Sequence, residues 1–544
     1  MACTFTDHRP PVELWPERIY TLPEFEYDAR ISLASTLLDA HVENGRGDRV
    51  AIVHGERRIT YAQLQRTVNR IGNGLRAQGL KPGGRVLLRM PNRPEFVATW
   101  LAVQKVGAVC VSTMPMLRAR ELAYVIRDSE ACLAVVAEEL LGEMEQAVEA
   151  SATPPTVVTA ADDETRSGAG LTLDALMMTG AETLEAHPVD RDDVAIIAYT
   201  SGSTGQPKGA CHAPIDILAS ADAYARQVLG ASPDDVFGGH PTLAFTYGLG
   251  AGLVFPMRVG ATTVLLDRFS PEALLDATAR HGVTLLSCGA TTYKMLLQID
   301  DLERRFDLSR LRLCISAGEP LPRSVHDEWL RRTGVEVLDG LGTTEMFHIF
   351  VSARPGDRRP GSTGRAVPGY EVRIVDDQLQ EVPRGTPGLL AVKGPTGCRY
   401  WRKPERQRDY VREGWNIPND ICVQDEDGFI WYQCRNDDLI ISAGYNIAGP
   451  EVEAVLIEHP AVLEAAVVAT PDAIKGHVPK AFVVVKPDAT PGPDLAHDLQ
   501  EHAKRELAPY KYPRKVEFVE ALPKTETGKI RRVELRKREL EGYG

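Results

Sequence analysis

The chain has 544 residues, of which 43% are hydrophobic and 25% are charged. This length exceeds what one hydrophobic core supports, and the composition excludes the disordered and fibrous classes of protein. A net charge of -13 argues against a surface that binds nucleic acid or an anionic membrane, because such surfaces need clustered Lys and Arg. The chain carries no secretory signal pattern and no bilayer-length apolar run, so we expect a cytoplasmic protein without nucleic-acid or membrane partners.

The first part of the chain alternates helical and strand-like patterns. From Thr60, a Thr-x-x-Gln capping pattern with apolar residues at helical spacing predicts an amphipathic helix. Strand-like and helical segments then follow one another at 85–90, 96–103, 108–114, 261–266, 271–282 and 283–288. Such alternation predicts parallel sheets covered by helices, and therefore an α/β fold.

Two changes of pattern divide the rest of the chain. Beyond about Gly361, short runs broken by Gly and Pro predict a small β-rich subdomain, and after RNDDLII the helix and strand patterns of a separate α/β module begin. We therefore predict an N-terminal domain at 1–436, with two α/β parallel-sheet subdomains and the β-rich subdomain, and a C-terminal α/β domain at 437–544. The segment from about 151 to 185 is weakly patterned and is expected at the surface.

The segment AIIAYTSGSTGQPKGACH (195–212) carries the strongest chemical signal. An apolar strand runs into a loop dense in Gly, Ser and Thr that ends at Lys208. Glycines let backbone N–H groups approach phosphate oxygens, hydroxyls add donors, and a lysine adds positive charge. The spacing is not that of a Walker A loop. A surface turn is the alternative, but a strand that leads directly into the loop favours a triphosphate site.

The stretch YTSGSTGQPKG resembles the phosphate loop of the adenylate-forming superfamily, which includes acyl-CoA synthetases, luciferases and nonribosomal adenylation domains. Three further segments resemble motifs of that family and occur in the family's order along the chain. They are SAGEPLP (316–322), similar to the adenine-binding turn, DGLGTTEM (339–346), similar to the motif whose carboxylate helps hold magnesium, and PKTETGKIRR (523–532), similar to the catalytic-lysine motif. The resemblance implies an AMP-forming acid–thiol ligase that uses ATP, Mg²⁺ and coenzyme A (CoA), with a mobile C-terminal domain.

Roles for single residues are implied by the same resemblance. Lys529 would be the adenylation lysine, Lys208 would meet the triphosphate, and Glu345 would take part in catalysis by holding Mg²⁺, which prefers hard oxygen ligands. Asp437 matches the hinge, and Gly444 would line the passage for the pantetheine arm of CoA. The residues that would contact ATP or AMP are Thr200, Ser201, Gly202, Ser203, Thr204, Gly205, Gly318, Glu319, Pro320, Asp339, Gly340, Leu341, Gly342, Thr343, Thr344, Asp420 and Arg435.

Two positions depart from the family pattern. Leu341 stands where an aromatic residue usually stacks on adenine, so the purine contact there would be apolar packing. Pro418 and Asn419 replace the usual Thr-Gly before Asp420, whose carboxylate suits a ribose diol because it can accept two hydrogen bonds. For Glu345 and Lys529, an ordinary solvated side chain is the alternative, and for Gly444 a plain turn glycine.

Three segments indicate the class of the carboxylic acid substrate, and they lie at 241–256, 345–350 and 444–453. They are most similar to the benzoate and 2-aminobenzoate (anthranilate) CoA ligase group, which implies an aromatic carboxylic acid as substrate, with anthranilate first and benzoate or hydroxybenzoate as alternatives. The expected acid pocket, a flat slot closed by aromatic edges, comprises Phe245, Tyr247, Gly248, Gly250, Gly289, Gly318 and His348. A structural histidine is the alternative for His348.

Other functions share parts of this pattern. A freestanding aryl-adenylating enzyme that loads a carrier protein has the same first half-reaction, and a luciferase-like oxygenase is a more distant alternative. A nucleotide sensor built on a decayed ligase would be expected to lose Lys529, Glu345 or Asp420, and all three are present. Possible protein partners are a carrier protein or a downstream acyltransferase, and a monomer or a homodimer is expected.

Overall fold

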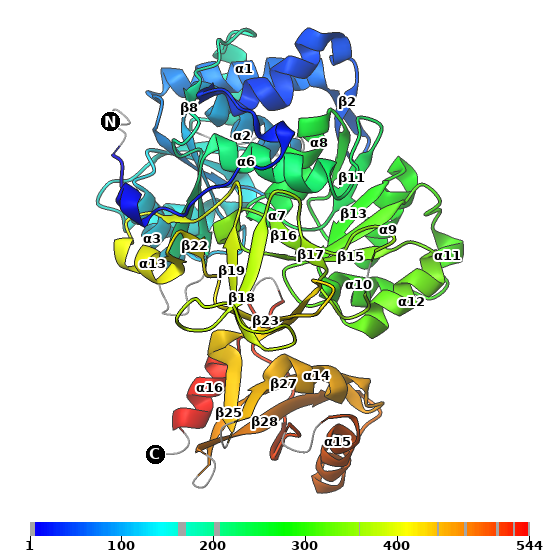
Figure 1. The fold of residues 1–544 in the computed structure, drawn as a ribbon. Coiled ribbons are helices and arrows are strands. Elements are labelled where there is room, and N and C mark those ends of the chain that lie inside the picture. The colour runs from blue at the N-terminus through cyan, green and yellow to red at the C-terminus, as the bar shows by residue number, and fades with distance from the viewer. Residues whose placement is uncertain are drawn as a thin grey trace. The chain divides into compact units, whose positions relative to one another are not determined.

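The computed structural model describes residues 6–161, 170–200, 207–357, 359–442, 445–472, 476–507, 511–525 and 528–541 (Figure 1). The chain divides into two compact units. The larger unit consists of Met1–Val372 and Val392–Ile417, and the smaller of Arg373–Ala391 and Pro418–Gly544. The predicted boundary after 436 and the mobility of the C-terminal domain stay predictions. Within the described ranges, every helix is too short or too polar to cross a lipid bilayer.

The larger unit contains a seven-stranded sheet that is parallel through its centre. Its strands lie in the order β20 (Arg399–Tyr400), β10 (Lys208–His212), β9 (Ile196–Thr200), β5 (Val109–Ser112), β4 (Arg85–Arg89), β6 (Leu133–Ala137) and β7 (Thr156–Ala160). β10 runs antiparallel to both of its neighbours, β9 and β20, and the other pairs in this sheet are parallel. Helices α3 (Ala119–Ser129) and α4 (Leu141–Glu149) pack against the sheet, where Leu122 and Met144 join the same apolar core as Leu87.

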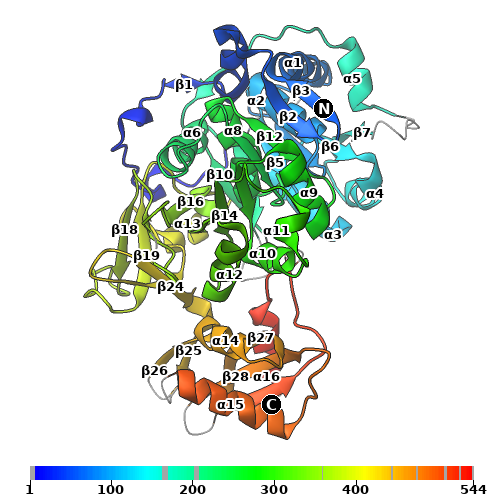
Figure 2. The same ribbon diagram turned by 90° about the vertical axis from the view of Figure 1, so that its right-hand side faces the viewer.

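A nine-stranded sheet forms the second half of the larger unit. Its order is β17 (Arg365–Ala366), β16 (Ile349–Ser352), β15 (Val337–Gly342), β14 (Leu313–Ala317), β13 (Leu285–Cys288), β11 (Val236–Gly239), β12 (Thr262–Leu265), β2 (Val50–His54) and β3 (Arg57–Thr60). Helices α9 (Pro271–His281), α10 (Ala290–Leu297), α11 (Leu302–Arg305) and α12 (Arg323–Thr333) lie together beside it (Figure 2). Leu275, Tyr293 and Trp329 from these helices build its core with Leu286 and Cys314.

Helix α1 (Tyr61–Ala77) begins with the predicted capping box, in which Thr60 Oγ1 accepts from Gln63 N and the Gln63 side chain accepts from Thr60 N. It packs on α2 (Pro94–Val106) and α5 (Leu173–Thr179). The segment 151–185 contributes β7 and α5. Most of its described residues are exposed or half-buried, as expected, and Leu173 and Leu176 of α5 are buried; residues 162–169 lie outside the described ranges. The other α-helices in the described part of this unit are α6 (Pro214–Ser220), α7 (Thr246–Leu249), α8 (Phe255–Val259) and α13 (Pro404–Tyr410).

The smaller unit joins β hairpins to an α/β module. Its hairpin strands are β23 (Asp420–Gln424), β24 (Ile430–Arg435), β25 (Leu439–Ser442) and β26 (Tyr445–Ala448), and β19 (Gly388–Lys393) pairs with β23 through Gly388 and Leu389. The module comprises α14 (Gly449–Glu458), β27 (Val462–Asp472), β28 (Gly476–Val485), α15 (Pro493–Glu506), β29 (Lys515–Phe518) and α16 (Arg532–Glu541). Val452, Leu456 and Leu499 pack against its sheet. The predicted fold class is confirmed.

Candidate active site

The predicted phosphate loop connects two antiparallel strands. Ser201, Gly202, Ser203, Thr204 and Gly205 lie outside the described residues, but both ends of the loop are described. Thr200 ends β9 and pairs with Lys208, which begins β10. Because Ala195 and residues 196–198 of the first strand are buried, the apolar run before the loop is explained by core packing. The strands therefore hold Thr200 and Lys208 opposite one another.

Lys208 and Glu345 meet at a tyrosine that the sequence did not indicate. The Tyr400 hydroxyl donates a hydrogen bond to Glu345 Oε1 at 2.7 Å. Lys208 Nζ lies 3.5 Å from the same hydroxyl oxygen and 5.1 Å from the centre of the tyrosine ring. Burial, followed by the proximity of Cys398 and Glu345, raises the pKa of Tyr400 far above its ordinary value, so the hydroxyl stays protonated and can donate.

The segment that carries Glu345 is tightly turned. Asp339, Gly340, Leu341 and Gly342 lie in β15, Thr343 caps the helical turn at Thr344–Met346, and Glu345 lies in that turn. A Cβ at Gly342 would stand 2.5 Å from the His348 carbonyl oxygen, so only glycine fits. Phe347 is buried and has φ 71° and ψ -50°, an unfavourable backbone conformation for a bulky residue. This strained residue separates Glu345 from His348.

A buried histidine supports the same turn. His212 Nε2 lies 2.7 Å from the Thr344 carbonyl oxygen, and its ring meets that of Phe347 edge to face at 5.4 Å. Burial lowers the pKa of His212 to about 4, so the imidazole is neutral near pH 7. Since a carbonyl only accepts, Nε2 carries the proton and donates. The sequence segment 195–212 ends at this residue, but nothing in the sequence marked it as a partner of Thr344.

The predicted adenine turn lies next to this segment. β14 and β15 are parallel neighbours, with Ser316 paired to Asp339, so Gly318, Glu319 and Pro320 follow β14 at the edge where β15 carries Gly340. Gly318 has φ 90°, and the Glu319 carboxylate accepts from Thr291 N at 2.6 Å and Thr291 Oγ1 at 2.9 Å. Gly289 lies beside it, since its Cβ would stand 3.1 Å from Glu319 Oε1.

Tyr247, Gly250 and His348 lie together. His348 Nε2 is 3.2 Å from the Tyr247 carbonyl oxygen, and a Cβ at Gly250 would stand 2.4 Å from His348 Cδ2. Burial lowers the pKa of His348 to about 3, which leaves a neutral ring. Two aromatic residues that the sequence did not indicate, Phe255 and Tyr224, pack on this ring with centroid distances of 4.5 and 5.7 Å.

The glycines of this cluster serve close packing rather than open space. A Cβ at Gly248 would stand 2.0 Å from the Thr242 carbonyl oxygen, so backbone atoms occupy the space that a side chain at this position would need. At Gly250, the ring of His348 occupies the corresponding space. Phe245, which is partly buried, directly precedes α7. The Tyr247 hydroxyl donates to the Cys288 carbonyl at 3.0 Å, which ties α7 to β13.

Asp339 lies close to one of these rings, because Ser352 Oγ is 3.3 Å from both the Tyr224 hydroxyl and the Asp339 carbonyl oxygen. Asp339 Oδ1 is buried and, among the described residues, has no hydrogen-bond partner. Burial raises the pKa of Asp339 to about 8. Burial is also the largest cause of the raised pKa values of Tyr224 and Tyr247, and the charge of Asp339 adds to both shifts. His348 Nδ1 is likewise buried without a partner in the described ranges.

The remaining predicted residues lie in the smaller unit. Asp420 and Arg435 are paired across β23 and β24, and Arg435 Nη1 lies 3.3 Å from Asp420 Oδ1. Lys529 is exposed and closes a turn in which its N–H donates to Thr525 Oγ1 at 3.1 Å. The backbone of Asp437 lies in a helical turn at Asn436–Asp438, and Gly444 lies outside the described residues.

Comparison with known proteins assigns the family. Residues 38–401 match the family model of AMP-binding enzymes. The chain belongs to the AMP-binding enzyme family. In this AMP-binding enzyme, residues 451–529 also match the model of the family's C-terminal domain. The predictions of an adenylate-forming enzyme and of an acid–thiol ligase are confirmed, the second by relatives that are named CoA ligases.

Several relatives of this AMP-binding enzyme are named for aromatic acids. It is 40% identical to benzoate–CoA ligase of Thauera aromatica, over 95% of this chain and 98% of the relative. It is 32% identical to 3-hydroxybenzoate–CoA ligase of Aromatoleum sp. (strain CIB), over 94% and 98%. The solved structure of the anthranilate CoA ligase AuaEII in complex with anthranoyl-AMP matches with a TM-score of 0.90 at 34% identity, covering 96% of this chain and all of that chain (100%).

Proposed function

We propose that this enzyme is an aryl acid–CoA ligase and that its acid is anthranilate. In the first step the acid carboxylate would attack the α-phosphate of ATP to give aryl-AMP and pyrophosphate. In the second step the CoA thiol would attack the aryl-AMP carbonyl to give aryl-CoA and AMP. The aromatic acids in the names of the relatives support the class of substrate.

The site chemistry suits the first step. A carboxylate that approaches a triphosphate is one anion meeting another, so fixed positive charge must offset the repulsion and stabilise the leaving pyrophosphate. Lys208 and Lys529 would supply that charge. The carboxylate of Glu345 is the type of hard oxygen ligand that Mg²⁺ prefers, and it lies beside Lys208, so it would hold the ion that neutralises the phosphates.

The observation that carries the choice of anthranilate is that two buried side-chain atoms, one in the predicted nucleotide motif and one in the aromatic cluster, lack partners among the described residues. Asp339 Oδ1 and His348 Nδ1 have no hydrogen-bond partner among the described residues. Since His348 Nε2 donates to the Tyr247 carbonyl, Nδ1 of the neutral ring is left as an acceptor. With a pKa of about 8, the Asp339 carboxyl is mostly protonated near pH 7 but keeps one acceptor oxygen. Buried polar atoms without partners are costly, and an ortho-amino group has two N–H donors. Such a site should penalise an acid that lacks the amino group.

Benzoate is the second candidate, favoured by the 40% identity to a benzoate–CoA ligase. The test is kcat/KM for anthranilate, benzoate, the hydroxybenzoates and medium-chain fatty acids, with free CoA and a holo-carrier protein compared as acceptors. We expect anthranilate to exceed benzoate by about tenfold or more. In Asp339→Ala and His348→Phe the ratio should fall towards one, with the KM for ATP measured alongside. Preference for benzoate would reject anthranilate, and preference for fatty acids would reject the aryl class.

A further inference from the structure

We propose that Tyr400 is a positioning residue for adenylation, which rests on the proposed function. Its hydroxyl joins the predicted metal ligand to the predicted phosphate-binding lysine, because it donates to Glu345 Oε1 at 2.7 Å while Lys208 Nζ stands 3.5 Å from its oxygen. The distance to Lys208 is at the outer limit of a hydrogen bond, and the ammonium also lies over the tyrosine ring at 5.1 Å. One side chain thus orients both charged groups.

The position of Tyr400 is fixed by its neighbours in the chain. Cys398 N donates to Asn416 Oδ1 at 3.0 Å, Tyr400 N to Gln407 Oε1 at 2.8 Å, and Trp401 N to the Gly209 carbonyl at 2.8 Å. Tyr400 also pairs with Ala210 of β10, the strand that begins at Lys208. A strand of only two residues is therefore held at each position by a polar side chain or a neighbouring strand.

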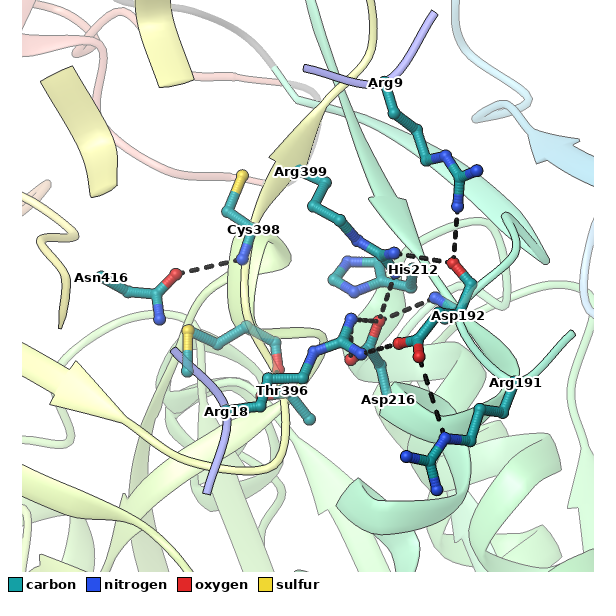
Figure 3. A network of polar contacts seen from close by, with 12 residues as sticks. Arg9, Arg18, Arg191, Asp192, His212, Asp216, Thr396, Cys398, Arg399 and Asn416 are labelled. Carbon is teal, nitrogen blue, oxygen red and sulfur yellow. Dashed lines mark hydrogen bonds and ion pairs between the residues drawn. The ribbon is translucent and has the colours of Figure 1, made fainter. Parts of the chain in front are cut away.

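The residue before Tyr400 anchors the strand in a buried ionic network (Figure 3). Arg399 and Asp216 have fully buried side chains, and Arg399 Nη2 lies 3.1 Å from Asp216 Oδ2. Arg399 Nη1 donates to the Asp192 carbonyl at 2.8 Å, and Arg18 Nη2 lies 2.9 Å from Asp216 Oδ1. A buried pair with this many partners resists displacement, because moving either charge would leave the other uncompensated. Arg399 and Tyr400 are successive residues, so the network fixes the tyrosine.

The chemistry requires a group that is both donor and acceptor. A protonated phenol can donate to a carboxylate and accept from an ammonium with its one oxygen, and phenylalanine can do neither. Hydrogen bonds to charged groups are among the stronger ones in proteins. Holding Glu345 in one rotamer before ATP arrives would place its carboxylate for Mg²⁺ without ordering it at that moment. Loss of the hydroxyl should therefore weaken binding of MgATP more than binding of AMP.

The test compares Tyr400→Phe with Tyr61→Phe. Tyr61 is a matched control, because its buried hydroxyl donates to the Ala261 carbonyl at 2.7 Å, and it belongs to no predicted site. Isothermal titration calorimetry should show the Kd for MgATP raised about tenfold in Tyr400→Phe, and the Kd for AMP nearly unchanged. Pyrophosphate exchange should require more Mg²⁺, while the KM for the acid and thiolation of preformed aryl-AMP stay near wild type. Tyr61→Phe should match wild type throughout.

A double-mutant cycle identifies the residue through which Tyr400 acts. In the Glu345→Gln background, adding Tyr400→Phe should change the Kd for MgATP by less than about threefold. A full tenfold effect in that background, or equal MgATP affinity of Tyr400→Phe and wild type, would overturn the positioning role. A wild-type enzyme that binds MgATP but exchanges no pyrophosphate with any aromatic acid would instead overturn the proposed function, and the binding comparison would still decide the role of Tyr400.

Discussion

Replacing Gly250 by alanine would test the packing around His348. Gly250 has helical backbone angles, so the added methyl group strains no dihedral angle, but its Cβ would stand 2.4 Å from His348 Cδ2 and 2.8 Å from Nε2. The histidine is buried among Phe255, Tyr224 and Tyr247 and has little room to retreat. The ring must shift, and its hydrogen bond to the Tyr247 carbonyl would be lost or lengthened.

The size of the effect follows from three contributions. Overpacking a buried site costs about 1–3 kcal/mol. Loss of one hydrogen bond costs about 1 kcal/mol more. Replacing glycine by alanine within a helix stabilises by up to about 1 kcal/mol. The net loss of folding free energy for Gly250→Ala should therefore be about 1–3 kcal/mol, and the KM for the acid should rise because His348 has moved.

Equilibrium urea unfolding and steady-state kinetics would measure the two effects. Gly252→Ala is the control from the same helical segment, since its Cβ would meet only the flexible end of Leu243 at 3.0 Å. That variant should stay within about 0.5 kcal/mol of wild type, with an unchanged KM for the acid. If Gly250→Ala were as stable as Gly252→Ala and bound the acid equally well, the tight contact at His348 would not exist in solution.

Two further predictions concern protons and half-reactions. The folded-state pKa of His212 is about 4 against an ordinary 6.5, so its contribution to stability is complete above pH 6.5 and is lost as the pH falls towards 4, by about 2 kcal/mol at pH 5. Urea unfolding at pH 7 and pH 5 should show that the free energy of unfolding falls less between these two pH values in His212→Asn than in wild type. An equal fall in both proteins would contradict the predicted role of His212. Lys529→Ala should abolish aryl-AMP formation yet leave thiolation of preformed aryl-AMP largely intact; equal loss of both steps would exclude the adenylation role.

Local patterns predicted most of the architecture. The helix at Tyr61–Ala77 follows from a cap and a 3.6-residue period, and the alternation of strands and helices gives parallel sheets because crossovers need helices. The end of the strand before the phosphate loop was predictable because the Gly, Ser and Thr residues of the loop directly follow an apolar run. The membership of 373–391 in the smaller unit has no local signal in the sequence, because it depends on the long-range pairing of β19 with β23.

What sequence reasoning missed depends on contacts between distant residues. Tyr400 is 55 residues from Glu345 and 192 from Lys208, and no local period connects them. Helix α5 lies in a weakly patterned segment, and it packs because Leu176 meets Gly74 of α1, where a Cβ would stand 2.6 Å from Leu176 Cβ. The sequence placed Gly248 and Gly250 in the expected acid pocket but did not indicate which atoms would pack on them, namely the Thr242 carbonyl oxygen at Gly248 and the His348 ring at Gly250.

The unusual backbone of Phe347 limits how freely the choice of acid can be redesigned. Glu345 and His348 lie on either side of this residue, one in contact with Tyr400 and the other with the aromatic cluster. A library that varies position 348 to accept larger acids would disturb the segment around Phe347, whose backbone angles are already unfavourable. The disturbance would reach the carboxylate of Glu345, three residues before position 348. Directed evolution of substrate scope should therefore succeed more often when position 348 is kept and Tyr224 or Phe255, which lie on other helical segments, are varied instead.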